Sequence, residues 1–423
     1  MKVSNYIPRI SDALLVNKLR HSGAVLITGP KWCGKTSTAL VASKSVVYMQ
    51  DPDKGPSYMM AADTKPSLLL EGNVPHLIDE WQMAPVLWDA VRFAVDRRQE
   101  FGQFILTGSS VPTDGATMHT GTGRIARLSM RTMSLFESGE SNGSVSLRNL
   151  FYGTKCPVMA ASQLTVEQIA FAICRGGWPA SVSMKGRDAL ELSRDYVDAI
   201  IHQDVSRVDG VERNPKRVQL LLRSLARNVS TMATNVTLLK DMEGDEKSMS
   251  APTLDAYLNA LRRIFVVEDQ PAWSPSMRSK TALRTASKRH FTDPSIATAI
   301  MRATPQSLLE DFNTFGLLFE SMCTRDMRIY SQANDGEVYH FRDKNGLEAD
   351  MIIALNDGRW AAVEVKLGNK QIEDAASHLQ ELARKVNDEK MGKPSFLMVL
   401  TGGEYAYQRK DGVLVVPIGC LKN

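Results

Sequence analysis

Long hydrophobic runs are absent from this 423-residue sequence, and aromatic residues make up only 7% of it. No apolar stretch approaches the roughly 18 residues that a membrane-spanning helix needs. The N-terminal stretch MKVSNYIPRI holds no apolar core, so we expect no secretory signal. No fixed-period repeat is present, which argues against a solenoid or a propeller. We therefore expect a cytoplasmic protein that does not associate with membranes.

Cysteine is also scarce, with 5 residues in the whole chain. They are scattered, without a C-x-x-C pair or a histidine at metal-ligand spacing, at Cys33, Cys156, Cys174, Cys323 and Cys420. This pattern predicts reduced thiols rather than disulfides or a zinc site. Lys and Arg number 51 against 47 Asp and Glu, so net charge alone does not indicate a nucleic-acid-binding protein.

The segment GPKWCGKT, residues 29–36, fits the phosphate-binding pattern G-x-x-x-x-G-K-[ST]. An apolar strand precedes it and a helix-compatible stretch follows it, as the pattern requires. The two glycines allow a tight turn that aims N–H groups at phosphate oxygens. Lys35 can reach the β- and γ-phosphates, and the Thr36 hydroxyl can bind Mg²⁺. We therefore predict ATP and Mg²⁺ as cofactors, with the nucleotide held by Gly29, Pro30, Lys31, Trp32, Cys33, Gly34, Lys35, Thr36 and Ser37.

Two carboxylates, Asp79 and Glu80, end an apolar approach at residues 74–80. From residue 20 to 135, short apolar strands alternate with helical patterns, which predicts a parallel sheet wrapped by helices. A strand end in such a sheet delivers both carboxylates beside the phosphate loop. There Asp79 would bind the Mg²⁺ shell, and Glu80 would orient and polarise the attacking water.

A further apolar strand, residues 103–108, ends at Ser109. A hydroxyl at the end of a central strand can contact the γ-phosphate or the attacking water, with Thr107 behind it. Gly-Ser-Ser is also good turn chemistry, so a plain turn is an equally open interpretation.

These segments resemble a known family. GPKWCGKT, LIDEWQMAP and FILTGSS, together with the opening residues 6–9, YIPR, are similar to the ATPase domain of a large prokaryotic group of AAA+-like proteins. In that group a C-terminal domain of unknown function follows the ATPase core. The resemblance implies that Lys35 and Thr36 form the Walker A site, that Asp79 and Glu80 form the Walker B site, and that Ser109 is the sensor. Many AAA+ proteins carry Asn at the sensor position.

Three arginines, Arg124, Arg127 and Arg131, follow in the stretch of residues 121–137. Any of them could stabilise the γ-phosphate of a neighbouring subunit as an arginine finger, with Arg124 and Arg127 the better placed. The alternative is that they flank a strand and face water. The finger interpretation predicts a homo-oligomer.

The middle of the chain reads as helical. Residues 138–162 are rich in Gly and Ser, which predicts a linker or an exposed loop. Helices are expected at 165–174, 187–205, 215–229 and 253–267, with a strand-like stretch at 264–270. Helices followed by a short strand pair resemble a winged-helix module. The acid-free basic run 277–290, with Lys288 and Arg289 near its end, predicts an exposed loop that either meets DNA, RNA or another phosphate-bearing partner or is simply solvated.

The last part of the chain alternates between helix and strand. Helices are expected at 308–325 and 372–385, and strands at 337–342, 347–355, 360–366, 395–400 and 413–418. Asp350 lies one strand ahead of Glu364 and Lys366, and the last two point to the same face of their strand. Carboxylates that clamp a metal ion, with a lysine near the attacking water, can hydrolyse a phosphodiester.

This layout resembles the PD-(D/E)xK, or restriction-endonuclease-like, superfamily. The same C-terminal unit characterises the prokaryotic group described above. The resemblance implies Asp350, Glu364 and Glu320 as metal ligands and Lys366 as a catalytic residue. Ala349 stands before the aspartate where the superfamily pattern has proline. The same fold is also reused for binding alone.

We therefore expect an α/β protein of three domains. They are a P-loop, AAA+-like ATPase domain at 1–160, a helical, winged-helix-like domain at 161–285 and a nuclease-like domain at 286–423. The sequence predicts an Mg²⁺-dependent ATPase acting as a nucleotide-driven switch on a domain that binds or cleaves DNA or RNA. The alternative is an ATP-gated regulator or scaffold whose nuclease-like domain is inactive. A third interpretation, a DNA-translocating motor, requires a closed ring.

Overall fold

The computed structural model describes residues 5–109, 120–153, 158–243, 249–275, 285–386 and 391–423. The chain divides into two compact units. Unit 1 comprises residues 1–132, 203–212 and 259–266, and unit 2 comprises residues 133–202, 213–258 and 267–423. Cys156 and most of the basic run 277–290 lie outside the described residues.

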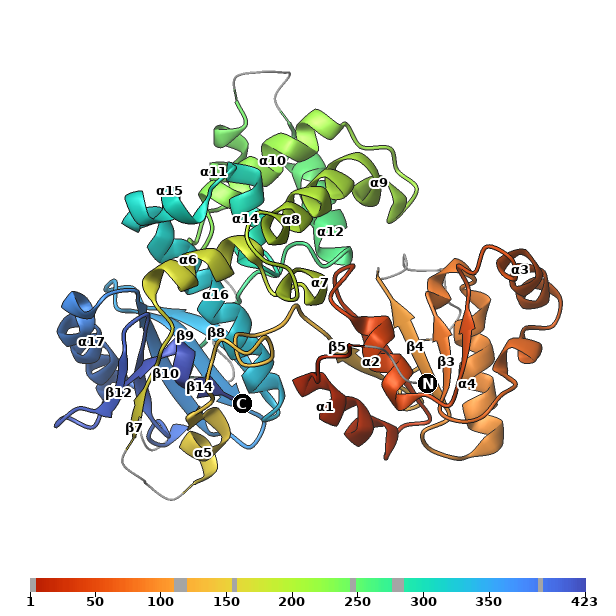
Figure 1. The fold of residues 1–423 in the computed structure, drawn as a ribbon, viewed down its shortest axis with the longest axis horizontal. Helices are drawn as coiled ribbons and strands as arrows, with labels where there is room; N and C mark the ends of the chain where they lie inside the picture. The colour runs from red at the N-terminus through yellow and green to blue at the C-terminus, as the bar shows by residue number, and fades with distance from the viewer. Residues whose placement is uncertain (1–4, 110–119, 154–157, 244–248, 276–284, 387–390) are drawn as a thin grey trace. The chain divides into compact units, whose positions relative to one another are not determined.

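Unit 1 is built on a five-stranded sheet in which every neighbouring pair is parallel (Figure 1). The strand order is β2-β3-β4-β1-β5. The strands are β1 Ala24–Thr28, β2 Ser45–Tyr48, β3 His76–Asp79, β4 Phe104–Gly108 and β5 Ile125–Ser129. The parallel sheet predicted from the alternating pattern is therefore confirmed. Because β1, β3 and β4 run the same way, their carboxyl ends meet at one edge.

Both faces of this sheet are covered by helices. The helices of unit 1 that precede residue 100 are α1 Ile10–Leu19, α2 Lys35–Ala42, α3 Gly55–Thr64 and α4 Val86–Arg98. Alternate residues of β1 enter different apolar clusters, since Leu26 packs with Trp88 of α4 while Ile27 packs with Leu15 of α1. A strand buried on both faces reads as a continuous apolar run, which is why β1 is recognisable in the sequence.

Unit 2 contains a seven-stranded mixed sheet of order β7-β12-β13-β11-β10-β9-β8. Its strands are β7 Met159–Ala161, β8 Gly336–Arg342, β9 Glu348–Leu355, β10 Trp360–Lys366, β11 Leu397–Thr401, β12 Tyr405–Gln408 and β13 Leu414–Pro417. Neighbours β8, β9 and β10 are antiparallel, whereas β10, β11 and β13 are parallel. The five strands predicted in this part of the sequence are present, and β12 is an addition.

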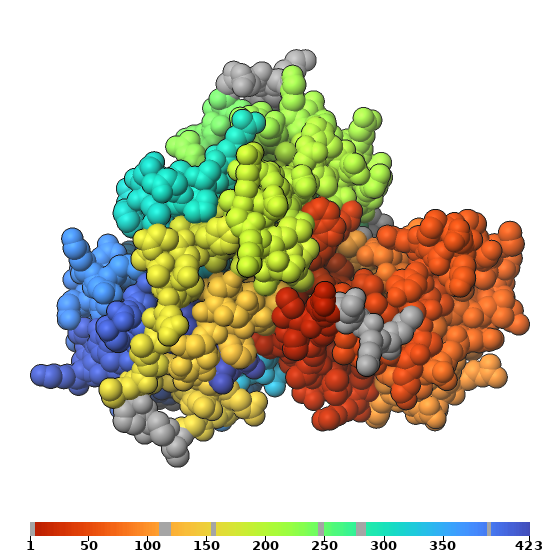
Figure 2. All heavy atoms as spheres, viewed as in Figure 1, coloured from red at the N-terminus to blue at the C-terminus, as the bar shows by residue number. Residues whose placement is uncertain are grey.

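The expectation of a linker or exposed loop at residues 138–162 is wrong. This segment contains β6 Val145–Ser146, α5 Leu147–Tyr152 and β7. Strand β6 pairs with β14 Leu421–Lys422, and β7 pairs with β12. In Figure 2 the yellow segment accordingly lies against blue C-terminal residues. Strands this short leave no periodic signal, and long-range pairing overrides the local Gly and Ser content.

The remaining helices fall in the middle and C-terminal parts. They are α6 Val166–Arg175, α7 Pro179–Val182, α8 Asp188–Ala199, α9 Val205–Arg207, α10 Pro215–Arg227, α11 Asn235–Asp241, α12 Ala251–Arg263, α14 Pro294–Met301, α15 Pro305–Glu310, α16 Phe312–Gln332 and α17 Ile372–Lys385. A π-helical turn, Ile200–Asp204, separates α8 from α9. Among the described residues no helix is long and apolar enough to cross a membrane.

Two predicted elements differ from the structure. The helix expected at 308–325 is divided at Asp311, whose side chain caps the N-terminus of α16 by accepting hydrogen bonds from the amides of Asn313 and Thr314. The strand-like stretch 264–270 forms only isolated bridges, from Val267 and Gln270. The winged-helix description of this region stays a prediction.

Candidate functional site

The phosphate-binding segment forms a tight turn between β1 and α2. Gly34 precedes α2 with a φ of 100°, a left-handed conformation that favours glycine. Gly29 has a φ of 154°, and a Cβ atom there would lie 2.1 Å from the carbonyl oxygen of Met130. Both glycines of the sequence pattern are therefore required by the backbone and by close packing.

Lys35, the first residue of α2, lies folded over this turn. Its side chain is buried, and its Nζ donates hydrogen bonds to the carbonyl oxygens of Gly29 at 3.0 Å and Pro30 at 2.7 Å. These neutral acceptors hold a positive charge at the mouth of the loop. A phosphate oxygen is a stronger, charged acceptor for the same ammonium group.

Asp79 joins three elements at the carboxyl edge of the sheet. It ends β3, and its Oδ1 accepts hydrogen bonds from the Thr36 hydroxyl of α2 at 2.8 Å and from the Thr107 hydroxyl of β4 at 2.7 Å. Thr107 is fully buried, so it fixes the rotamer of the aspartate. The Thr36 hydroxyl and the Asp79 carboxylate thus supply the oxygen ligands that Mg²⁺ prefers, and these residues fit the ion.

Glu80 follows directly and adopts a backbone conformation that is rare for residues other than glycine. Its φ is 57°, and its amide donates to the Thr107 hydroxyl at 3.1 Å. The Glu80 Oε2 accepts hydrogen bonds from the Ser109 hydroxyl at 3.2 Å and from the Gln82 amide. Backbone strain of this kind persists where the surroundings impose it, often at functional sites. Glu80 and Ser109, predicted separately, are brought together here.

The other residues of the predicted nucleotide-binding loop differ in exposure. Cys33 is buried, whereas Trp32 is about half exposed. Lys31 forms an ion pair of 2.5 Å with Asp204. Ser37 lies in the first turn of α2. None of these positions is excluded from a bound nucleotide by the fold, and their assignment stays a prediction.

The two candidate arginine fingers are exposed on unit 1. Arg124 pairs with Asp96 at 2.7 Å, and the Arg127 guanidinium lies 5.9 Å from the centre of the Trp88 ring. A finger acts on a second copy of the chain, so these contacts within one copy leave the prediction untested.

Arg9, the last residue of the YIPR segment, connects the phosphate-binding loop to the chain beyond β5. It is buried and donates from Nη1 to the carbonyl oxygen of Cys33 at 2.7 Å and from Nη2 to that of Arg131 at 2.9 Å. The amide of Met130 also donates to the carbonyl oxygen of Thr28 at 2.7 Å. An isolated arginine near the N-terminus carries no sequence signal for this role.

A second cluster of ionisable residues lies in unit 2. Glu364 of β10 is buried and Asp350 of β9 is partly buried, and Asp350 Oδ2 accepts a hydrogen bond from the amide of Val365 at 2.9 Å. Lys366 donates to Glu364 Oε2 at 3.0 Å. Beside the cluster opens a pocket of about 440 Å³, which residues of α17 also line. The structure thus brings together the β-strand residues that the sequence predicted.

Lys288 completes this cluster, although its basic surroundings in the sequence predict an exposed loop. Its Nζ lies 2.8 Å from Glu320 Oε1 and 2.9 Å from Asp350 Oδ1. Lys288 and its neighbour Arg289 are buried, and Arg289 pairs with Asp269 at 3.0 Å. The expectation that these two residues lie on an exposed basic loop is therefore wrong. Partly buried carboxylates attract them, and no local pattern links positions so far apart in the sequence.

Burial and charge shift the pKa values of the cluster in opposite directions. Burial acts against the charge of Lys288, but Asp350 and Glu320 outweigh it and raise the lysine pKa above its ordinary value. Burial raises the pKa of Glu320 to about 7, and the charge of Asp350 adds to this effect. Burial also raises the pKa of Glu364. For Asp350, the attraction of Lys288 and Lys366 overcomes burial and lowers the pKa.

Comparison with known proteins identifies domains along the chain. Residues 21–138 match the family model described as an AAA domain. Residues 166–307 and 315–421 match two models described as domains of unknown function, DUF8612 and DUF4143.

The relatives that match nearly the whole chain share less than a quarter of its residues. Uncharacterized proteins of Mycobacterium bovis and Mycobacterium tuberculosis are each 23% identical over 418 residues, which cover 97% of this chain and 83% of theirs. Among solved structures, a Walker-type ATPase of Pyrococcus abyssi is 14% identical, with a TM-score of 0.42 over 71% of this chain and 97% of that one.

The AAA match covers the strands, the loop and the paired carboxylates described above. The N-terminal part of the chain is therefore a P-loop ATPase domain. The three domain boundaries expected from the sequence stay a prediction.

Proposed function

We propose that this chain binds and hydrolyses Mg·ATP and uses the nucleotide to switch the state of its C-terminal part. The observation that carries the proposal is the joint hydrogen bonding of Thr36 and Thr107 to Asp79. It places a loop hydroxyl and a strand-end carboxylate together beside Lys35, with Glu80 next in the chain. Such an arrangement suits a nucleoside triphosphate and its metal ion.

Each residue has a role in this proposal. Lys35 exchanges its two carbonyl partners for phosphate oxygens, and Thr36 and Asp79 hold Mg²⁺. When bound, the ion neutralises charge on the β- and γ-phosphates. Glu80 polarises the attacking water, and Ser109 orients the Glu80 carboxylate through the hydrogen bond at 3.2 Å. The left-handed backbone of Glu80 aims its side chain away from the direction that a regular strand would give.

A switch needs a route out of the nucleotide site. Within unit 1, the turn carrying Gly29 and Cys33 packs against Met130 and is connected through Arg9 to Arg131. A phosphate that draws Lys35 away from the loop carbonyls changes the same turn. The chain segment that leaves β5 is therefore coupled to loop conformation by direct hydrogen bonds and packing.

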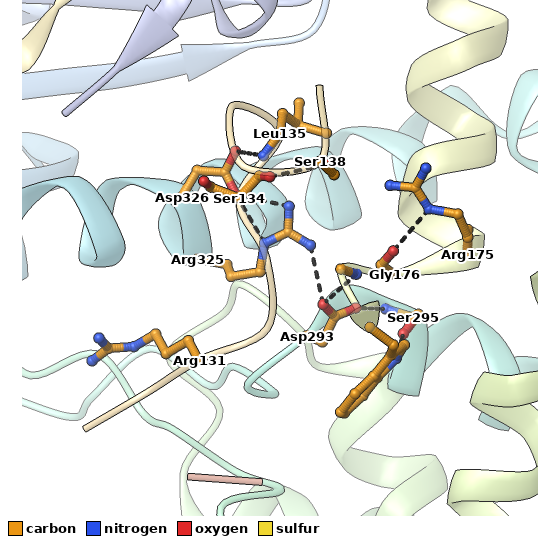
Figure 3. A network of polar contacts seen from close by, with 12 residues as sticks. Arg131, Ser134, Leu135, Ser138, Arg175, Gly176, Asp293, Ser295, Arg325 and Asp326 are labelled. Atoms are coloured by element: carbon orange, nitrogen blue, oxygen red, sulfur yellow. Dashed lines mark hydrogen bonds and ion pairs between the residues drawn. The ribbon is translucent and has the colours of Figure 1, made fainter. Parts of the chain in front are cut away.

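The next few residues of the chain are anchored in unit 2. The amide of Met133 donates to the carbonyl oxygen of Gly177 at 2.6 Å, and the amide of Leu135 donates to Asp326 Oδ2 at 2.9 Å. Figure 3 shows Leu135 and Asp326 in this network. Asp326 lies on α16, the same helix that carries Glu320. Helix α16 is thus the element through which we propose that a change at Arg131 is received.

The test is hydrogen exchange at the amides of residues 133–135 in a Glu80→Gln variant, which is expected to bind ATP without turning it over. We expect at least about a threefold difference in exchange rate between the ATP-bound and ADP-bound forms, which corresponds to roughly 0.7 kcal/mol in local opening. The matched control is an Arg9→Met variant. It should bind ATP but lose the difference, because the link between Cys33 and Arg131 is gone. Identical exchange in both nucleotide states would contradict the switch and leave the ATPase intact.

A second candidate function keeps the ATPase and differs only in what the C-terminal domain does. The C-terminal domain, which we propose has the nuclease-like fold, would be catalytically inactive, and the chain would be an ATP-gated regulator or scaffold. The burial of Lys288 within the acidic cluster favours it. Incubation with DNA and RNA in Mg²⁺ or Mn²⁺ distinguishes an inactive C-terminal domain from an active nuclease, with Lys366→Ala as the control. We expect no cleavage above that control, whereas cleavage that Lys366→Ala abolishes would favour an active nuclease.

A further inference from the structure

Lys288 occupies the centre of the acidic cluster in unit 2. Its ammonium group lies within hydrogen-bond distance of Glu320 and Asp350, at 2.8 and 2.9 Å. The exposed fraction of its side chain is 6%, against 13% for Glu320 and 14% for Asp350. Lysine side chains are rarely buried to this degree unless carboxylates pair with them, as Glu320 and Asp350 do here.

The backbone fixes Lys288 in this position. Its amide and carbonyl exchange hydrogen bonds of 3.0 and 2.9 Å with Gln270 in an antiparallel bridge. The fully buried Gln270 side chain in turn donates to the carbonyl oxygens of Tyr339 at 2.9 Å and Asp350 at 3.0 Å. Lys288 is therefore attached, through one residue, to the strand that carries Asp350. Its ammonium position is built into the fold rather than reached by a loose surface side chain.

A divalent cation does not fit this cluster as it is arranged. The oxygens Glu320 Oε1 and Asp350 Oδ1 accept from Lys288, and Asp350 Oδ2 accepts from the amide of Val365. Lys366 occupies Glu364 Oε2. Among the described residues, no group of three or more His, Cys, Asp and Glu side chains is arranged to hold a metal ion. Four carboxylate oxygens of the cluster, including the two that face each other across Lys288, therefore already accept hydrogen bonds from nitrogen donors.

We propose that the Lys288 ammonium is the resident cation of this cluster, standing where a divalent ion would otherwise bind between Glu320 and Asp350. A full positive charge about 3 Å from each carboxylate supplies the attraction that a metal ion would otherwise supply. The domain that contains the cluster therefore takes up no divalent ion there and does not use one to cleave phosphodiesters. This inference concerns unit 2 and does not depend on the proposed ATPase switch.

The test is Mn²⁺ binding by the full chain without nucleotide, followed by electron paramagnetic resonance of the free ion. All proteins carry Asp79→Asn, so the ATPase site does not contribute its carboxylate. We expect no saturable Mn²⁺ site in the chain with Lys288. Replacing Lys288 by Met, which removes the charge but keeps an unbranched chain, should create one saturable site per chain. That site should bind Mn²⁺ at least about tenfold more tightly than the weak, non-saturating binding of the chain with Lys288. Adding Asp350→Asn to Lys288→Met should abolish that site.

Two results would overturn the inference. One is a saturable Mn²⁺ site in the chain with Lys288 that Glu364→Gln removes. The other is a Lys288→Met protein that keeps its circular dichroism spectrum and gains no ion. Because the first measurement needs no change at Lys288, it decides the matter even where Lys288→Met fails to fold.

Discussion

Replacing Lys35 by Ala is expected to reduce ATP hydrolysis by at least about 100- to 1000-fold, the cost of removing one preorganised charge donor from a reacting phosphate. The structure shows how this charge is held ready for the phosphates. Lys35 is buried, and its Nζ is held by the carbonyl oxygens of Gly29 and Pro30 at the mouth of the turn. Nucleotide binding should weaken as well, because the ammonium contacts the phosphates before and during the reaction.

The measurements are phosphate release and the binding of a fluorescent ATP analogue. Glu80→Gln should lose hydrolysis to a similar degree yet keep nucleotide binding, since Glu80 acts on water rather than on phosphate. Lys44→Ala, at an exposed lysine beyond α2, serves as the matched control and should behave as the unmodified chain. Robust turnover by Lys35→Ala or by Glu80→Gln would refute the assignment of this site.

The second large effect is expected at Arg325. Its guanidinium lies between two buried carboxylates, at 3.0 Å from Asp293 Oδ2 and 2.7 Å from Asp326 Oδ1, and Figure 3 shows the three side chains together. The exposed fraction is 2% for Arg325 and 0% for each aspartate. Arg325→Met leaves two uncompensated buried charges, so we expect unit 2 to lose about 3–5 kcal/mol of stability.

The loss should depend on pH in a definite direction. Burial already raises the pKa of Asp326 to about 6, even though Arg325 acts to lower it. Without the arginine, this pKa should rise further above the value in the unfolded chain. A carboxyl group with a raised folded-state pKa gains stability as the pH falls, so the deficit of Arg325→Met should be smaller at pH 5 than at pH 8.

Urea unfolding at the two pH values checks this result. Arg187→Met removes an exposed ion pair with Glu191 and should cost less than about 1 kcal/mol at either pH. An Arg325→Met deficit that is equally small, or that grows at pH 5, would show that Arg325 does not stabilise unit 2 by compensating the charges of Asp293 and Asp326.

Local patterns predicted the candidate nucleotide site because its residues stand in short contiguous segments. The loop that contains Lys35 is eight consecutive residues, and Asp79 and Glu80 follow each other at a strand end. The hydrogen bond between Thr36 and Asp79 then follows from the parallel order of β1 and β3 in one sheet. For the same reason Asp350, Glu364 and Lys366 could be placed near one another, on neighbouring strands.

The sequence could not place residues whose partners are distant and whose own surroundings look ordinary. Lys288 stands in an acid-free basic run, which reads as exposed, yet it binds carboxylates on α16 and β9. Asp293 precedes a proline as a helix cap and also pairs with Arg325 on another helix. In each case burial makes a long-range ion pair decisive, and no spacing rule encodes it.

Strand β7 has a consequence for how the chain acquires its shape during synthesis. It forms the edge of the seven-stranded sheet beside β12, although the whole helical middle of the chain separates the two. Its partner emerges from the ribosome roughly 240 residues later, a delay of about 12–50 s at ordinary bacterial to eukaryotic elongation rates. Until β12 has been synthesised, β7 has no strand to pair with. A fragment that begins at residue 286 would lack β7 altogether and would leave β12 as an open edge bearing Tyr405, a typical site for aggregation.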